Sequence, residues 1–117
     1  MKFIDKIDFE AYVNLIFNAK HRIYLCSPGI EEELAEALVK RVNQIEIKVV
    51  IDNSEKTIRN GYGEIKGIET LKSAGIDIYE CNGNLVSFII SDSEGYFLFP
   101  QSRIFNAEPQ GPNAVKI

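Results

Sequence analysis

Apolar residues recur with helical spacing in three stretches of the chain. The first stretch follows Asp8, a suitable N-cap, and its apolar stripe consists of Phe9, Tyr12, Val13, Ile16 and Phe17. A second helix is expected over residues 31–43, where three glutamates at the start and Lys40 and Arg41 at the end match the helix dipole. A third helix is expected from residue 65 and ends at Gly75, a residue type common just after helices.

Shorter apolar stretches between these helices predict β-strands. Residues 22–27 are apolar on both faces, which is typical of a strand covered by helices on both sides. Residues 45–52 and 76–80 begin with alternating apolar and polar positions. The apolar run 85–92 is expected to be the central strand, and a turn ending at Gly95 joins it to a second strand, 96–99, as a hairpin.

The order of these elements predicts an α/β fold, with a mixed, largely parallel sheet flanked by helices and a C-terminal hairpin. The polar segment 53–64 contains Asn60-Gly61-Tyr62-Gly63 and is expected to be a long loop without regular structure. Residues 113–117 resemble the beginning of a strand that is cut off. We therefore expect one domain over 1–117 that is a fragment of a longer chain.

The composition narrows the classes of function. With 117 residues, 45% hydrophobic and 26% charged, the chain is typical of a soluble globular domain, and its net charge of −4 disfavours nucleic-acid binding by this domain alone. A signal peptide and a bilayer-spanning run are both missing from the sequence, so a cytoplasmic location without membrane contact is expected. Cys26 and Cys81 are expected to be reduced. Two cysteines and one histidine are too few for a metal site, and no cofactor motif occurs.

Candidate site residues follow the predicted strands. Ligands of open parallel sheets bind outside the carboxyl ends of the strands. Those ends carry Ser27, Asp52 and the Cys81–Asn84 turn, although polar strand ends are also ordinary in this class of fold. Nucleophilic catalysis would need a base beside a Ser or Cys, and the only histidine, His21, lies in a charged turn before the first strand.

The combination of segments 19–41, 45–52, 60–80 and 85–92 resembles one half of the phospholipase D superfamily in order and spacing. In that family the strand corresponding to 85–92 carries an HxKxxxxD motif. The resemblance implies a histidine that attacks a phosphodiester and a lysine that neutralises charge on the phosphoryl oxygens. It also implies that two such halves face each other across a dimer or an internal repeat.

The motif positions of this chain depart from the family pattern. The histidine position is Leu85 and the lysine position is Ser87, whereas Asp92 keeps its residue type. A leucine has no lone pair for attack on phosphorus, and a neutral hydroxyl replaces an ammonium group poorly. Asp92 is also explained as the first residue of a turn. The following strand leads into Pro100-Gln101-Ser102, which retains at most one serine of the second family segment.

Three hypotheses of function follow. The first is a catalytically inactive phospholipase D-like module that binds a ligand, a protein partner, a second phospholipase D-like domain or a second copy of itself. Its candidate ligand contacts are Ser27, Asp52, Arg59, Tyr62, Ser87 and Gln101. The second is part of a nuclease or phosphodiesterase whose intact motif lies in another domain or chain. The third is a purely structural dimerisation domain.

Overall fold

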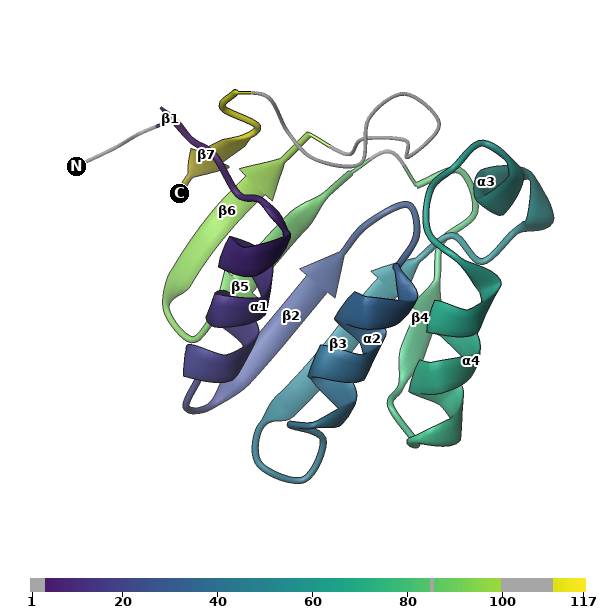
Figure 1. Ribbon diagram of the computed structural model, residues 1–117, viewed down its shortest axis with the longest axis horizontal. Helices are drawn as coiled ribbons and strands as arrows, with labels where there is room; N and C mark the ends of the chain where they lie inside the picture. The colour runs from purple at the N-terminus through teal and green to yellow at the C-terminus, as the bar shows by residue number, and fades with distance from the viewer. Residues whose placement is uncertain (1–3, 85, 100–110) are drawn as a thin grey trace.

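The computed structural model describes residues 4–84, 86–99 and 111–117 (Figure 1). The helices are α1 (Phe9–Asn18), α2 (Glu32–Val39), α3 (Glu55–Arg59) and α4 (Ile65–Ser73). The strands are β1 (Ile4–Asp5), β2 (Arg22–Cys26), β3 (Glu46–Ile51), β4 (Ile78–Glu80), β5 (Phe88–Ser91), β6 (Glu94–Leu98) and β7 (Ala114–Lys116). Together the strands form one seven-stranded sheet in the order β1-β7-β6-β5-β2-β3-β4.

The sheet is mixed, as the sequence predicts, and β5 lies at its centre. Its parallel part is limited to β2, β3 and β4, and the pairings of β5, β6, β7 and β1 are antiparallel. A parallel neighbour needs a crossover of a dozen or more residues. Only residues 81–87 separate β4 from β5, which is too short for such a crossover. The chain therefore enters β5 in the opposite direction and pairs with β2 on the side away from β3.

The helices α1, α2 and α4 lie side by side over one face of the sheet (Figure 1). The hydrophobic core fills the space between them and the sheet, and its fully buried side chains include Ile16, Ile23, Leu38, Val49, Ile51, Leu71 and Ile89. The expectation that helices cover β2 on both sides is wrong for the described residues. On the other face of β2, the ring of Tyr24 is half-buried beneath the side chains of Arg22 and Lys48.

Two further expectations need correction. Helix α2 ends at Val39, and Arg41 lies in the turn beyond it. The Arg41 guanidinium donates to the carbonyl oxygens of Ile16, Phe17 and Ala19, so it satisfies the end of α1 instead of the dipole of α2. The segment 53–64 is not free of regular structure, because Ser54 caps the short helix α3 by accepting from the backbone N–H of Thr57.

The segment 113–117 forms β7, which pairs with β1 on one side and β6 on the other. The predicted strand is therefore present, and it joins the two ends of the described chain. The N–H of Ile117 donates to the carbonyl of Gly95 at 2.8 Å, and Asn113 donates to and accepts from the backbone of Ile7. These contacts hold the last strand in the sheet.

Two loops interlock at the upper edge of the sheet in Figure 1. The N–H of Glu64 donates to the carbonyl of Ile30, and its carboxylate accepts from the N–H of Glu32 at the start of α2. A Cβ on Gly29 would lie 2.1 Å from the carbonyl oxygen of Tyr62, and a Cβ on Gly67 would lie 2.4 Å from that of Ile30. The backbone of each glycine therefore touches the backbone of the other segment, and only a residue without a Cβ fits at Gly29 and Gly67.

Candidate functional site

The polar side chains predicted to follow the strands gather at one edge of the sheet. The carboxyl ends of β2 and β3 meet the amino end of β5 there, because Cys26 pairs with both Val50 and Phe88. We call the resulting group the rim, and it consists of Tyr12, Cys26, Ser27, Asp52, Asn84 and Ser87. It lies at the end of the sheet nearest α3 in Figure 1.

Asp52 is buried and serves as an internal brace of the rim. One carboxylate oxygen accepts from the N–H of Ser54 at 2.9 Å, and the other accepts from the Thr57 hydroxyl at 2.8 Å and the N–H of Gly83 at 2.9 Å. These hydrogen bonds, that of Ser54 foremost, lower the pKa of Asp52 to about 2. The carboxylate is therefore ionised at neutral pH and ties β3 to α3 and to the turn after β4.

Replacing Asp52 by asparagine is expected to lower the free energy of unfolding by about 2 kcal/mol at pH 7, because charged hydrogen bonds to three donors are lost or weakened. The folded-state pKa of Asp52 lies below its ordinary value of 3.8. Its stabilisation is therefore complete above pH 3.8 and disappears as the pH falls towards 2. Urea unfolding of both proteins between pH 7 and pH 2 measures this, and a gap that stays constant over that range would contradict the assignment.

Asn84 links β2 to the segment before β5. Its side-chain amide donates to the Ser27 carbonyl at 3.1 Å and to the Cys26 sulfur at 3.4 Å, and its Oδ1 accepts from the N–H of Val86. Burial raises the pKa of the Cys26 thiol, which stays protonated and donates to the carbonyl of Val86. The sequence places Asn84 in the turn at the end of a predicted strand but does not indicate its contacts with Cys26 and Ser27, because these lie 58 and 57 residues earlier in the chain.

Ser87 is buried at the start of β5, where the resemblance places the family lysine. Its side chain is hydrogen-bonded to the hydroxyl of Tyr12, which α1 brings in from the helix layer, and burial raises the pKa of Tyr12. In the sequence, Tyr12 belongs to the apolar stripe of its helix, and nothing there predicts a polar partner for it. The three side chains Tyr12, Cys26 and Ser87 are thus neutral at pH 7.

The remaining predicted contacts lie around the rim or outside the described part of the chain. Arg59 is exposed at the end of α3, and Tyr62 is half-buried in the turn that follows. Tyr62 is connected to the rim through Thr57, whose hydroxyl donates to Asp52 and whose carbonyl accepts from the backbone N–H of Tyr62, whereas Arg59 only shares the helix α3 with Thr57. Gln101 lies outside the described residues, as does Leu85.

Asp92 lies at the opposite end of the sheet from the rim. It occupies the β5–β6 turn with a φ of 55°, and its carboxylate accepts from the backbone N–H groups of Lys20, His21 and Arg22. These hydrogen bonds, led by that of Lys20, lower the pKa of Asp92. Asp92 therefore fixes the entry into β2, which is a structural role.

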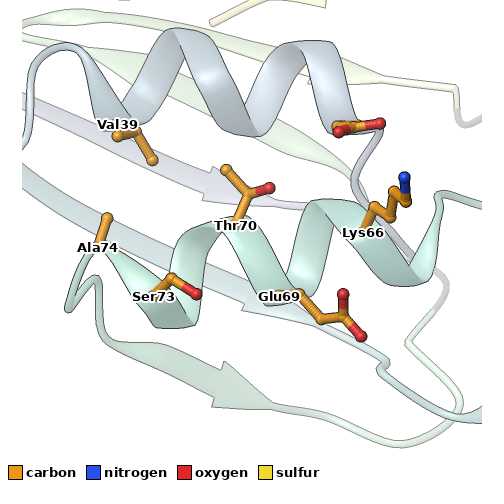
Figure 2. Close-up of a pocket in the computed structure, with 7 residues that line it drawn as sticks. Val39, Lys66, Glu69, Thr70, Ser73 and Ala74 are labelled. Atoms are coloured by element: carbon orange, nitrogen blue, oxygen red, sulfur yellow. The ribbon is translucent and has the colours of Figure 1, made fainter.

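A separate groove of about 590 Å³ runs between α2 and α4 (Figure 2). Val39, Thr70 and Ala74 point into the gap between the two helices, whereas Glu69 and Ser73 point away from it. The groove is shallow and lies on the helix layer, away from the rim. Within the described ranges, no cluster of three or more His, Cys, Asp or Glu could hold a metal ion, and no helix is long and apolar enough to cross a membrane.

Comparison with solved structures identifies the class of fold. The chain superimposes on Nuc from Salmonella typhimurium, a phospholipase D family member, with a TM-score of 0.64 and 21% identity over 91% of this chain and 72% of Nuc. It also superimposes on TrmBL2, an archaeal chromatin protein with a novel mode of DNA binding, with a TM-score of 0.56 and 20% identity over 89% of this chain and 40% of TrmBL2. No family model and no curated protein sequence matches the chain. The fold is phospholipase D-like.

Proposed function

We propose that this chain is a catalytically inactive phospholipase D-like module that binds a polar ligand at the rim. The single observation that carries the proposal is the position of its only histidine. His21 is exposed just before β2, whereas Ser87 lies beside the other end of that strand. Five residues of β2 at about 3.3 Å each separate the two ends, which leaves no imidazole of this chain within reach of Ser87.

The side chains of the rim favour a neutral, hydroxyl-bearing ligand over a phosphodiester. The one charged side chain of the rim is Asp52, which is negative. Hydrogen bonds from other residues of the chain already compensate that charge. The other side chains are hydroxyl, thiol and amide groups, which suit hydrogen bonding to a polar neutral molecule such as a sugar. Asp52 and Ser87 are buried and support the site, whereas Ser27, Arg59 and Tyr62 are accessible enough to contact the ligand.

A thermal-shift screen with neutral sugars, nucleotides and inorganic phosphate tests the binding proposal. A neutral sugar is expected to raise the melting temperature in a concentration-dependent way, because it binds only the folded state. Arg59→Ala and Tyr62→Phe are each expected to raise the dissociation constant of the sugar about tenfold. Lys72→Ala, at the exposed end of α4, should leave that constant unchanged. No stabilisation by any compound would contradict ligand binding and favour a purely structural domain.

Hydrolysis of bis(p-nitrophenyl) phosphate and of single-stranded DNA tests the claim of inactivity. We expect no turnover above the uncatalysed rate, because an attacking imidazole and a charge-neutralising lysine are both missing from the motif positions. Turnover that disappears in Ser87→Ala would overturn the proposal and support a phosphodiesterase instead.

A further inference from the structure

The dipeptide Asn-Gly occurs twice in the chain, at Asn60-Gly61 and at Asn82-Gly83. Asparagine is a chemically labile residue. A following glycine hinders the asparagine side chain least, because glycine has no Cβ and adopts many backbone conformations. The glycine nitrogen can then attack the side-chain carbonyl of the asparagine, which loses its amide group. The two sites share this local chemistry, and only their surroundings distinguish them.

The surroundings of Asn60-Gly61 oppose this attack. Gly61 is buried, and its N–H donates to the carbonyl of Ile58 at 3.0 Å in the turn that ends α3. The N–H of Asn60 donates to the carbonyl of Lys56, also at 3.0 Å. Attack by the Gly61 nitrogen would require these hydrogen bonds to break and the buried segment to leave its place.

The turn at Asn82-Gly83 is open to solvent. Both residues are exposed, and a Cβ on Gly83 would meet no atom of a non-adjacent residue within 4 Å. The N–H of Gly83 donates to the buried carboxylate of Asp52 at 2.9 Å. Local opening of an exposed turn costs little free energy, so this hydrogen bond is an important restraint on the Gly83 nitrogen.

We propose that Asn82 is a site of spontaneous deamidation beside the rim, and that Asp52 restrains the reaction by holding the Gly83 N–H. The Gly83 nitrogen forms a bond to the side-chain carbonyl carbon of Asn82, and the bond from that carbon to the amide nitrogen breaks. Ammonia leaves with the proton of the Gly83 N–H. Water then opens the succinimide at either carbonyl and gives aspartate or isoaspartate at position 82. The reaction consumes water, releases ammonia and needs no oxidant.

The Asp52 carboxylate restrains the Gly83 nitrogen instead of acting as its base. Loss of the N–H proton would place a second negative charge within hydrogen-bond distance of the carboxylate, and like charges disfavour this. The hydrogen bonds to Asp52, that of Ser54 foremost, lower its pKa to about 2. A carboxylate with such a pKa is a weak base at neutral pH, so it holds the proton without removing it.

Deamidation would alter the rim. Either product carries a new negative charge near Asp52, and isoaspartate also lengthens the main chain by a carbon atom. The N–H of Asn84 donates to the carbonyl of Cys81 across this turn at 3.2 Å, and a longer chain would separate the two groups. Asn84 would then move away from Ser27, whose carbonyl accepts from its side chain. The proposal goes beyond ligand binding at the rim and does not depend on it.

Incubation of the folded chain at pH 7, followed by peptide mass spectrometry, measures the rate of deamidation at each site. We expect Asn82 to react about tenfold faster than Asn60, because an exposed turn opens more readily than a buried one. In guanidinium chloride the two rates should agree within about threefold, since the unfolded chain removes the difference in surroundings. A folded chain in which Asn82 does not react, or reacts no faster than Asn60, would overturn the proposal.

The variant Asp52→Asn is expected to raise the rate at Asn82 about tenfold, because a hydrogen bond to a charged acceptor is lost or weakened. Thr57→Val is the matched control. It removes the hydroxyl that donates at 2.8 Å to the same oxygen of Asp52 as the Gly83 N–H, but it keeps the carboxylate. Its rate at Asn82 should stay within about twofold of the wild type.

Circular dichroism verifies that both variants fold, and the rate at Asn60 in each variant reports on global unfolding. A slower reaction in Asp52→Asn would show that the carboxylate acts as a base. Equal acceleration by both variants would show a general loosening of the turn. Either result would overturn the role proposed for Asp52.

Discussion

Replacing Gly67 by alanine is expected to lower the free energy of unfolding by about 3 kcal/mol. In most helices this change raises stability, because alanine has a helix propensity about 1 kcal/mol better than that of glycine. At Gly67 the new Cβ would lie 2.4 Å from the carbonyl oxygen of Ile30 and 3.1 Å from the carbonyl carbon of Glu31. Both atoms are backbone, so relief requires α4 to move away from the start of α2.

Urea unfolding followed by circular dichroism measures this effect at pH 7. Ser73→Ala is the matched control, because Ser73 is exposed in the last turn of the same helix. It should change the free energy of unfolding by less than about 0.5 kcal/mol. A Gly67→Ala variant as stable as the wild type would show that the two helices do not approach as closely as described.

Replacing Arg41 by alanine is expected to lower the free energy of unfolding by about 2–3 kcal/mol. Its guanidinium donates to the Ile16 carbonyl at 3.0 Å, to that of Phe17 at 2.5 Å and to that of Ala19 at 2.7 Å. These are the carbonyls that the end of a helix leaves without partners. The Nε of Arg41 is buried without a partner among the described residues. This cost offsets part of the stabilisation that the three hydrogen bonds provide.

Thermal and urea unfolding of Arg41→Ala, Arg41→Lys and Lys40→Ala separate geometry from charge. Lysine keeps the charge but lacks the planar fork that reaches three carbonyls, so we expect it to recover less than half of the loss. Lys40 is exposed, and its removal should have little effect. Equal stability of the lysine variant and the wild type would show that only the charge at the end of α1 matters.

Most of the secondary structure could be predicted from the sequence because it rests on local patterns. The stripe from Phe9 to Phe17 identified α1, and the apolar run 85–92 identified the strand that lies at the centre of the sheet. Helix ends were less certain. The helical periodicity of 31–43 continues past Val39, yet a turn replaces the helix there. In that turn the backbone N–H of Arg41 donates to the carbonyl of Leu38, while its guanidinium donates to the end of α1, a contact that local periodicity does not reveal.

The candidate site was predictable only in outline. Ser27 and Asp52 follow directly from the rule that parallel strands end at one edge, and the structure brings them near Ser87. Tyr12 had no such signal, since an apolar stripe explains it in the sequence, and Asn84 was predicted at the edge only as part of the Cys81–Asn84 turn, without its partners. Their polar partners come from strands far along the chain, and those contacts exist only after folding.

The sequence by itself determined most of the elements and their order, with β1 and α3 as the exceptions, since these depend on residue identity and on spacing over a few positions. The tertiary structure alone decided that β5 pairs antiparallel with β2, that the ionised Asp52 braces three segments, and that one face of the sheet is left without a described helix. The physical reason is that these features depend on contacts between distant segments, which local periodicity does not encode.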